Sequence, residues 1–310
     1  MGFIKNFAKL ATTPQRKIVL ELIETALESI QPEKVLEDFS VENLESYENV
    51  YLIGFGKGSA KISKIIEEKL DNKLTEGYVI DVTSEQFTKI QLTEGTHPLP
   101  SQTNLDFTKK VIERFKNKLS EKDLIIVVVT GGGSALFELP HSLSLSELDK
   151  LDKALLQAGD NINEMNIVRK HLSKVKGGDL AKMLYPSKVL SLIFSDVPGN
   201  DLATIASGPT VKDETTMNEV NSILEEYGIK DLPASALAET PKENKYFEKV
   251  ENILMLSNQT ALDAMKKKAN ELGIETQIYF DAVQGEAKIV GIELIKAANP
   301  NSILLAGGET

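Results

Sequence analysis

Residues 124–134 read LIIVVVTGGGS, six aliphatic residues that run straight into a glycine-rich turn. An uninterrupted run of Leu, Ile and Val is typical of a strand buried on both faces of a parallel sheet. The same order recurs at residues 50–60, VYLIGFGKGSA, where a short apolar run again opens into glycines. The remaining candidate strands are 78–82, 189–194, 253–256, 274–280 and 303–305.

Amphipathic segments with recognisable helix starts lie between these strands. Thr13-Pro14 supplies an N-cap followed by proline at the first helical position. Ser144 and Glu147 have the spacing of a capping box. Alternating strands and helices predict an α/β fold, a three-layer α/β/α sandwich with a mainly parallel, Rossmann-like sheet. Such sheets bind ligands beyond the carboxyl ends of their strands.

A domain boundary is predicted within residues 232–249, which hold two prolines, many charges and no clear periodicity. A new strand and helix pattern begins at Ile253. We therefore expect an N-terminal lobe at 1–240 and the beginning of a second α/β lobe at 250–310. The chain stops at a glycine turn, Gly307 to Thr310, so we expect this second lobe to be incomplete.

Composition excludes several classes of function. The chain has 310 residues, no cysteine and a formal charge of -11. The missing cysteines exclude disulfides and thiolate chemistry, and the acidic balance disfavours nucleic acid as a partner. No apolar run has the length of a membrane span and the N-terminus lacks a signal peptide, so we expect a cytoplasmic protein. Clustered cations in such an acidic chain point to anionic ligands.

The turn at residues 54–60 combines three glycines with a lysine. Glycines allow a backbone to approach a phosphate closely, which indicates a phosphate-binding loop. A purely structural, tight strand-to-helix turn has the same sequence pattern. The spacing is not that of a P-loop, and Ser59 replaces the third glycine of a dinucleotide fingerprint. Asp81, at the end of the next strand, could then read a ribose hydroxyl, which keeps a dehydrogenase open. Lys57 favours phosphoryl transfer instead.

Two later segments also suggest anion binding. Three consecutive glycines before Ser134 cost chain entropy, which favours an anion or nucleotide cradle over a merely structural turn. Arg169, Ser173 and Lys176 lie at helical spacing and predict a cationic stripe, the alternative being a solvated basic face. His171 in the same run is equally compatible with a satisfied, partly buried histidine.

The segment at residues 195–201, SDVPGND, follows another predicted strand. Asp196 at the end of that strand could hold Mg²⁺ or orient a substrate hydroxyl. A turn of the Asp-x-Pro-Gly kind is as often structural. The segment EGTHPLP, residues 94–100, is a weaker turn of the same type.

Taken together, these segments resemble the type-2 glycerate kinases. The matching stretches are IGFGKGSAKIS, EGTHPLP, VTGGGSALFELP, NIVRKHLSKVKGGDLA, SDVPGNDLATIASGPT and LLAGGET, in the family's order from about Val50 to Thr310. The resemblance implies transfer of the γ-phosphate of ATP to D-glycerate with Mg²⁺, usually giving 2-phosphoglycerate. It also implies two lobes with the active site between them.

The resemblance further implies roles for individual residues. Lys57 resembles the family's essential lysine, Arg169 would clamp the glycerate carboxylate, and Asp196 would act beside them as the metal ligand. Residues expected to contact substrate or nucleotide are Gly54, Gly56, Gly58, Ser59, Gly131, Gly132, Gly133, Ser134, Lys176 and Asn200. The expected partners are D-glycerate and ATP, with a homodimer as a further option.

Two other functions stay open at the level of sequence. One is an NAD(P)-dependent hydroxypyruvate or 2-hydroxy-acid reductase, favoured by the turn at 54–58 and by Asp81. The other is a truncated, non-catalytic nucleotide-binding module, because the family continues past LLAGGET through a stretch that supplies another arginine.

Overall fold

The structure, a computed structural model, describes residues 2–157 and 162–310. The chain divides into two compact units, which are considered separately. The larger comprises residues 40–194 and 201–254, and the smaller comprises residues 1–39, 195–200 and 255–310.

The larger unit is built on a six-stranded sheet with the order β3-β2-β1-β4-β5-β6. Register is parallel for β1 with β2 and β4, for β2 with β3, and for β4 with β5. The strands are β1 (Asn49–Phe55), β2 (Leu74–Asp81), β3 (Ile90–Glu94), β4 (Asp123–Val129), β5 (Lys188–Phe194) and β6 (Val250–Leu256). Every residue of β4 is buried, as its unbroken aliphatic sequence predicts.

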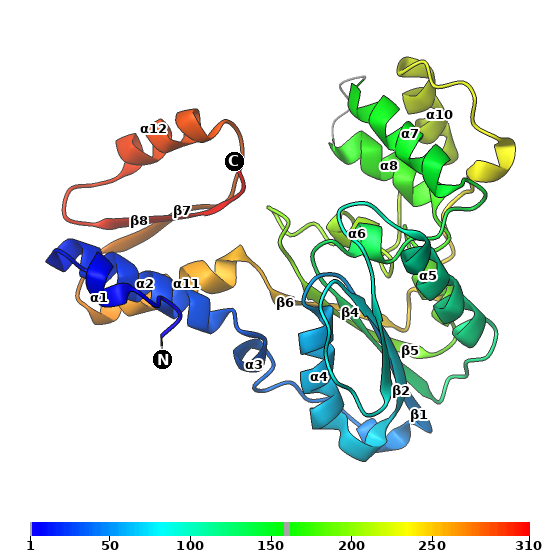
Figure 1. Cartoon of the computed structure of the whole chain (residues 1–310), viewed down its shortest axis with the longest axis horizontal. Helices are drawn as coiled ribbons and strands as arrows, with labels where there is room; N and C mark the ends of the chain where they lie inside the picture. Colours follow the sequence, from blue (N-terminus) through cyan, green and yellow to red (C-terminus); the bar gives the residue numbers. More distant parts are fainter. Residues whose placement is uncertain (1, 158–161) are drawn as a thin grey trace. The chain divides into compact units, whose positions relative to one another are not determined.

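Helices cover this sheet. Helix α4 (Ser59–Leu70) packs on β1, β2 and β4, whereas α5 (Gln102–Phe115) packs on β2 and β3. Figure 1 shows the two helices on opposite sides of the sheet. Right-handed crossovers require this arrangement, because the chain moves outward from β1 to β2 and returns across β1 from β3 to β4. The expected α/β/α arrangement with a mainly parallel sheet is confirmed.

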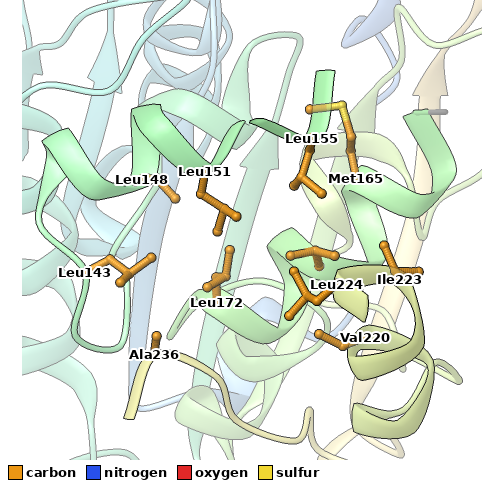
Figure 2. Packing of buried hydrophobic residues seen from close by; sticks show 11 residues of the cluster. Leu143, Leu148, Leu151, Leu155, Met165, Leu172, Val220, Ile223, Leu224 and Ala236 are labelled. Carbon is orange, nitrogen blue, oxygen red and sulfur yellow. The ribbon is translucent and has the colours of Figure 1, made fainter. Parts of the chain in front are cut away.

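A helical cluster stands beside the sheet within the larger unit. It contains α7 (Leu145–Gln157), α8 (Ile162–Leu172) and α10 (Met217–Glu226), and the predicted capping box joins Ser144 to Glu147 at the start of α7. Figure 2 shows the apolar side chains that converge between these helices. They are Leu143, Leu148, Leu151, Leu155, Met165, Val168, Leu172, Val220, Ile223, Leu224 and Ala236. Beside this apolar contact, Arg169 of α8 donates from Nε to Oδ1 of Asp152 of α7 at 3.1 Å.

Short elements complete the larger unit. They are η1 (Leu44–Ser46), η2 (Asp71–Lys73), α6 (Gly133–Leu136), α9 (Asp179–Leu184), η3 (Ile205–Ser207), η4 (Ala234–Ala236) and η5 (Asn244–Tyr246). Among the helices of residues 2–157 and 162–310, none is both long and apolar enough to cross a membrane.

The smaller unit pairs the first helices with the C-terminal segment. Helix α2 (Pro14–Ser29) begins at the Thr13 cap expected from the sequence and packs against α11 (Asn258–Glu271). The other elements are α1 (Phe7–Leu10), α3 (Pro32–Val35), the parallel strands β7 (Thr276–Val283) and β8 (Ile303–Gly308), and α12 (Ala287–Ala297). Residues 1–39 thus cluster with the C-terminal segment, whereas the sequence-based division groups them with residues 40–240; the boundary at 240–250 stays a prediction.

Candidate functional site

The first two glycine turns lie against each other. Strands β1 and β4 are parallel neighbours, so the turns that follow them meet at one edge of the sheet. The backbone N–H of Lys57 donates to the carbonyl of Gly131 at 2.8 Å. Gly56 has a φ of +114°, and a Cβ on it would lie 2.5 Å from the backbone oxygen of Thr130. Gly56 is therefore required for the close approach of the two turns.

Gly54 and Ser59 have packing positions. A Cβ on Gly54 would lie 2.8 Å from the hydroxyl of Ser63, so this glycine lets α4 approach the strand. Ser59 is fully buried and donates its hydroxyl to the carbonyl of Ile80 at 3.0 Å. The expected contact of these two residues with a ligand stays a prediction. Gly58, with a φ of +84°, starts α4 and is exposed.

Asp81 does not have the geometry of a ribose-binding residue. Its carboxylate is fully buried and accepts the N–H of Ala60 at 2.9 Å and that of Val82 at 2.6 Å. It thus occupies the N-terminus of α4, where a dinucleotide pyrophosphate would have to bind. Asp81, the residue that favoured a reductase in the sequence, therefore caps the N-terminus of α4.

Lys57 and the second turn form one edge of the site. A Cβ on Gly132, which has a φ of +78°, would lie 3.2 Å from Cε of Lys57 and 2.7 Å from Cδ2 of His97. The Lys57 side chain is exposed, and within the described residues no carboxylate forms an ion pair with it. Ser134 lies 3.1 Å from the hydroxyl of Ser207. A cation available to an incoming anion therefore lies beside the glycine turn.

A cavity of about 430 Å³ adjoins this edge and contains the other predicted cations. Its wall includes Nε of Arg169, 3.1 Å from Oδ1 of Asp152, and the ammonium of Lys176, which is hydrogen-bonded to Glu138. Both members of the second pair are buried. The lining residues are His97, Pro98, Leu99, Pro100, Gly132, Ser134, Ala135, Glu138, Leu148, Asp149, Asp152, Lys153, Leu156, Arg169 and Lys176.

The cationic stripe is not one helix face, and the sequence prediction is wrong here. Helix α8 ends at Leu172, and Ser173 forms an antiparallel bridge with Pro140. The N–H of Lys174 donates to Leu139 at 2.8 Å, so pairing with the segment after α6 ends the helix. Lys176 lies in the next turn. The fold nevertheless brings Arg169 and Lys176 to the same cavity.

The turn that carries Lys176 is fixed by a second segment. The N–H groups of Gly177 and Gly178 donate to the carbonyls of Ser207 and Gly208, both at 2.9 Å. Ser207 and its neighbour Ala206 have positive φ values of 61° and 50°. Such backbone strain persists only where the surroundings enforce it, and it is often found at functional sites.

His171 is the satisfied buried histidine that the sequence left as one of two options. Its side chain is fully buried, with Nδ1 2.9 Å from the carbonyl of Ile167 and Nε2 3.2 Å from Glu239.

Asp196 and Asn200 lie in the loop after β5. Asp196 is exposed, and Asn200 has a φ of 53°. Both cluster with the smaller unit, whereas the cavity belongs to the larger one, so their roles stay predictions. In residues 2–157 and 162–310, no group of three or more His, Cys, Asp or Glu side chains could hold a metal ion. A lone carboxylate at a strand end does fit Mg²⁺ that is held mainly by substrate phosphates and water.

Three cavity residues were missed by reasoning from the sequence. His97 lies in a segment interpreted only as a weak turn, and Glu138 lies two residues after the end of the short helix α6. Asp152 lies on the polar face of α7. The only sequence signal was their closeness to glycine turns or to a capped amphipathic helix.

An open, mainly parallel sheet with glycine turns at its strand ends and a cation-lined cavity beside them is typical of doubly wound α/β proteins that bind small anionic ligands. The family described as Domain of unknown function (DUF4147) matches residues 18–240, and the chain belongs to that family.

Similar proteins include a D-glycerate 2-kinase from Thermotoga maritima, 35% identical in an alignment of 284 residues that covers 89% of this chain and 66% of that protein. A putative hydroxypyruvate reductase from Agrobacterium vitis is 33% identical in an alignment of 317 residues that covers 95% of this chain and 70% of that protein. A crystal structure of a glycerate kinase from Thermotoga maritima has a TM-score of 0.85 at 32% identity, covering 95% of this chain and 74% of that one. The resemblance to glycerate kinases is thereby confirmed. The chain spans 66% to 76% of the length of three glycerate 2-kinases that it matches.

Proposed function

We propose that the protein is a glycerate 2-kinase, which transfers the γ-phosphate of ATP to D-glycerate. The observation that carries the proposal is the convergence of Lys57, the turn at Gly131–Ser134 and the cavity that contains Arg169 and Lys176. Phosphoryl transfer requires mainly positioning and stabilisation of charge, and backbone amides with cations supply both.

Arg169 is the residue we assign to the substrate carboxylate. Its side chain is partly exposed in the cavity, and Asp152 holds it through a single contact from Nε. The two terminal nitrogens of the guanidinium are suited to clamp a carboxylate at the same time. Asp152 thus orients Arg169 through Nε and leaves the two terminal guanidinium nitrogens available for the carboxylate of glycerate.

Lys57 is assigned to the transferring phosphoryl group. The attacking hydroxyl oxygen of glycerate forms a bond to the γ-phosphorus, the bond to the bridging oxygen of ADP breaks, and the hydroxyl proton is released. Negative charge is spread over the phosphoryl oxygens in the transition state. An exposed lysine beside the glycine turn can neutralise that charge without first breaking an ion pair.

The proposal also includes Mg²⁺ as cofactor, 2-phosphoglycerate as product, a cytoplasmic location and a homodimer. Asp196 would hold the ion, which would neutralise charge on the nucleotide phosphates, and Asn200 would contact a substrate nearby. The roles of Asp196 and Asn200 rest on the resemblance of residues 195–210 to the type-2 glycerate kinases.

The test is a coupled assay of ADP release with D-glycerate, comparing Lys57→Ala with the wild type. We expect turnover to fall by about two to four orders of magnitude with an unchanged circular dichroism spectrum, as for loss of one preorganised charge-stabilising group. Lys61→Ala, on the exposed side of α4, is the matched control and should keep near-normal turnover. Near-normal activity of Lys57→Ala would refute the role of Lys57.

The reductase alternative makes a different prediction. It requires NADH oxidation with hydroxypyruvate, and one similar protein carries that name. Because Asp81 caps α4, we expect no such oxidation. A rate of NADH oxidation above that of ADP release would reverse the choice.

A further inference from the structure

Glu138 is a buried carboxylate in the cavity to which the phosphoryl transfer described above gives no role. The residue is 5% exposed, and its Oε2 accepts a hydrogen bond from Lys176, which is 2% exposed. The backbone around it is fixed, because the next two residues pair with Ser173 and Lys174. The carboxylate therefore has a defined place at the wall of the cavity.

The second oxygen of Glu138 is open to the cavity. Within the described residues, Oε1 has no hydrogen-bond partner. The hydroxyl of Ser63 is the one side-chain polar atom there that is both completely buried and without a partner, so Oε1 of Glu138 must retain some accessible surface. Glu138 lines the cavity. A nearly buried carboxylate oxygen without a donor is costly, so a ligand that supplies a donor gains affinity there.

The other two acidic side chains of the cavity differ from Glu138. Asp149 is paired at 2.6 Å with Lys153 one turn along α7, and both are solvent-accessible. Asp152 holds Arg169 and is 24% exposed. Glu138 alone among the residues that line the cavity combines burial of a carboxylate with an open acceptor.

We propose that Glu138 is the specificity-determining residue for the hydroxyl of glycerate that is not phosphorylated. The inference rests on the proposed function and deepens it. Lys57 is exposed at the edge of the site and Glu138 is deep, so the reacting hydroxyl lies toward Lys57 and the second hydroxyl toward Glu138. Lys176 neutralises the glutamate, so the substrate carboxylate at Arg169 meets no uncompensated negative charge.

The site then selects acids with a second hydroxyl. For phosphorylation at the 2-position, the second hydroxyl is the one on carbon 3, which D-lactate lacks. D-lactate keeps the carboxylate and the 2-hydroxyl, so it is the matched probe. A site built around a charged acceptor rejects an analogue without the donor, because the acceptor is then left unpaired.

The experiment compares D-glycerate and D-lactate with wild type, Glu138→Gln and Glu138→Asp. Affinities are measured by calorimetry and turnover by ADP release. Glu138→Gln replaces a charge-assisted bond by a neutral one, and Glu138→Asp keeps the charge but withdraws the oxygen by one methylene. We expect the preference for D-glycerate over D-lactate to fall by about tenfold in both variants, with KM for D-glycerate raised and kcat little changed.

The control is Asp149→Asn, which removes a cavity carboxylate whose partner is on the surface, and its preference should equal that of the wild type. An equal loss of affinity for both acids in the Glu138 variants would overturn the proposal, since Glu138 would then act only by positioning Lys176. An unchanged preference would also overturn it. Failure of the wild type to phosphorylate D-glycerate would instead refute the proposed function and the inference together.

Discussion

Asp179 begins helix α9 three residues after Lys176 and has an unusual titration. Burial raises the pKa of its carboxyl to about 6, although Lys182, Lys116 and Lys242 oppose the shift. Between about pH 4 and 6 the folded chain therefore binds more protons at Asp179 than the unfolded chain does. The free energy of unfolding falls as pH rises through that range, and the whole cost of burying the charge is present above it.

We therefore expect Asp179→Asn to stabilise the protein relative to the wild type at pH 7 but not at pH 4. The gain in the free energy of unfolding of the variant over the wild type should be larger at pH 7 than at pH 4 by on the order of 2 kcal/mol. The loss of a favourable charge at the start of a helix reduces this gain. Denaturant unfolding at a series of pH values measures it. A difference that stays constant from pH 4 to pH 7 would contradict the raised pKa.

The residues of the site were only partly predictable from the sequence. Lys57 and Arg169 are identifiable because cations beside glycine turns are conspicuous in an acidic chain. Glu138 and Asp152 are not, because each becomes significant through a partner that lies far along the chain, 38 residues away for Glu138 and 17 for Asp152. The packing of Gly54 against Ser63 and the hydrogen bond from Ser59 to Ile80 were not predictable, because a residue needed for packing and one needed for a ligand look alike in sequence.

At the level of elements, a buried network holds α8 and the turn that carries Lys176. Lys170 donates to Oδ1 of Asp213 at 3.1 Å, while Thr215 and Thr240 donate to Oδ2 at 2.8 and 3.0 Å. Gly177 packs directly on the network, since a Cβ there would lie 2.8 Å from Thr240 and 3.2 Å from Lys170. Burial acts to raise the pKa of Asp213, but the hydroxyl of Thr215 and the ammonium of Lys170 hold it below its usual value.

Removing one charge of this network should lower the free energy of unfolding much more than replacing the Lys170–Asp213 pair with apolar side chains. Asp213→Asn leaves Lys170 buried without its counter-charge, and we expect a loss of about 3 kcal/mol in the free energy of unfolding together with reduced turnover. The double variant Lys170→Met with Asp213→Leu should recover most of the stability, because a buried pair can be replaced by packed apolar groups.

Denaturant melts and ADP release measure both effects. Glu113→Gln, which breaks an exposed ion pair with Lys109, is the control and should change stability by less than about 0.5 kcal/mol. If the double variant were as unstable as Asp213→Asn, the ion pair itself would not be the source of the loss.

Elements with an uninterrupted apolar sequence were predicted well, and those decided by long-range pairing were not. β4 is recognisable from its sequence alone. β3 was missed because only its first residue, Ile90, is buried and three of its five residues are polar. Arg169, Ser173 and Lys176 have helical spacing in the sequence, but the helix ends at Leu172 because Ser173 pairs with Pro140. Local periodicity cannot reveal a partner 33 residues away.

At the scale of the whole chain, the two units differ in how much apolar surface each buries. In the described part of the smaller unit, the buried hydrophobic side chains are Leu22, Leu36, Leu262, Ala269 and Leu305. Helix α12 contributes no buried residue, and its Ile295 is 78% exposed. In the larger unit, by contrast, nearly every residue of β1 and β4 is buried. Because apolar burial is the main stabilising contribution, the units should differ in stability.

We therefore expect the amides of α11, β7 and β8 to exchange with solvent through openings of lower free energy than those of β1 and β4. Leu262→Ala, in the thin core of the smaller unit, should lower the opening free energy of α11 by about 2 to 3 kcal/mol and leave β4 unchanged. Leu124→Ala in β4 is the reciprocal variant and should accelerate exchange in the larger unit. Native-state hydrogen exchange resolves the two cases, and equal acceleration in both units by either variant would mean that the chain unfolds as one cooperative body.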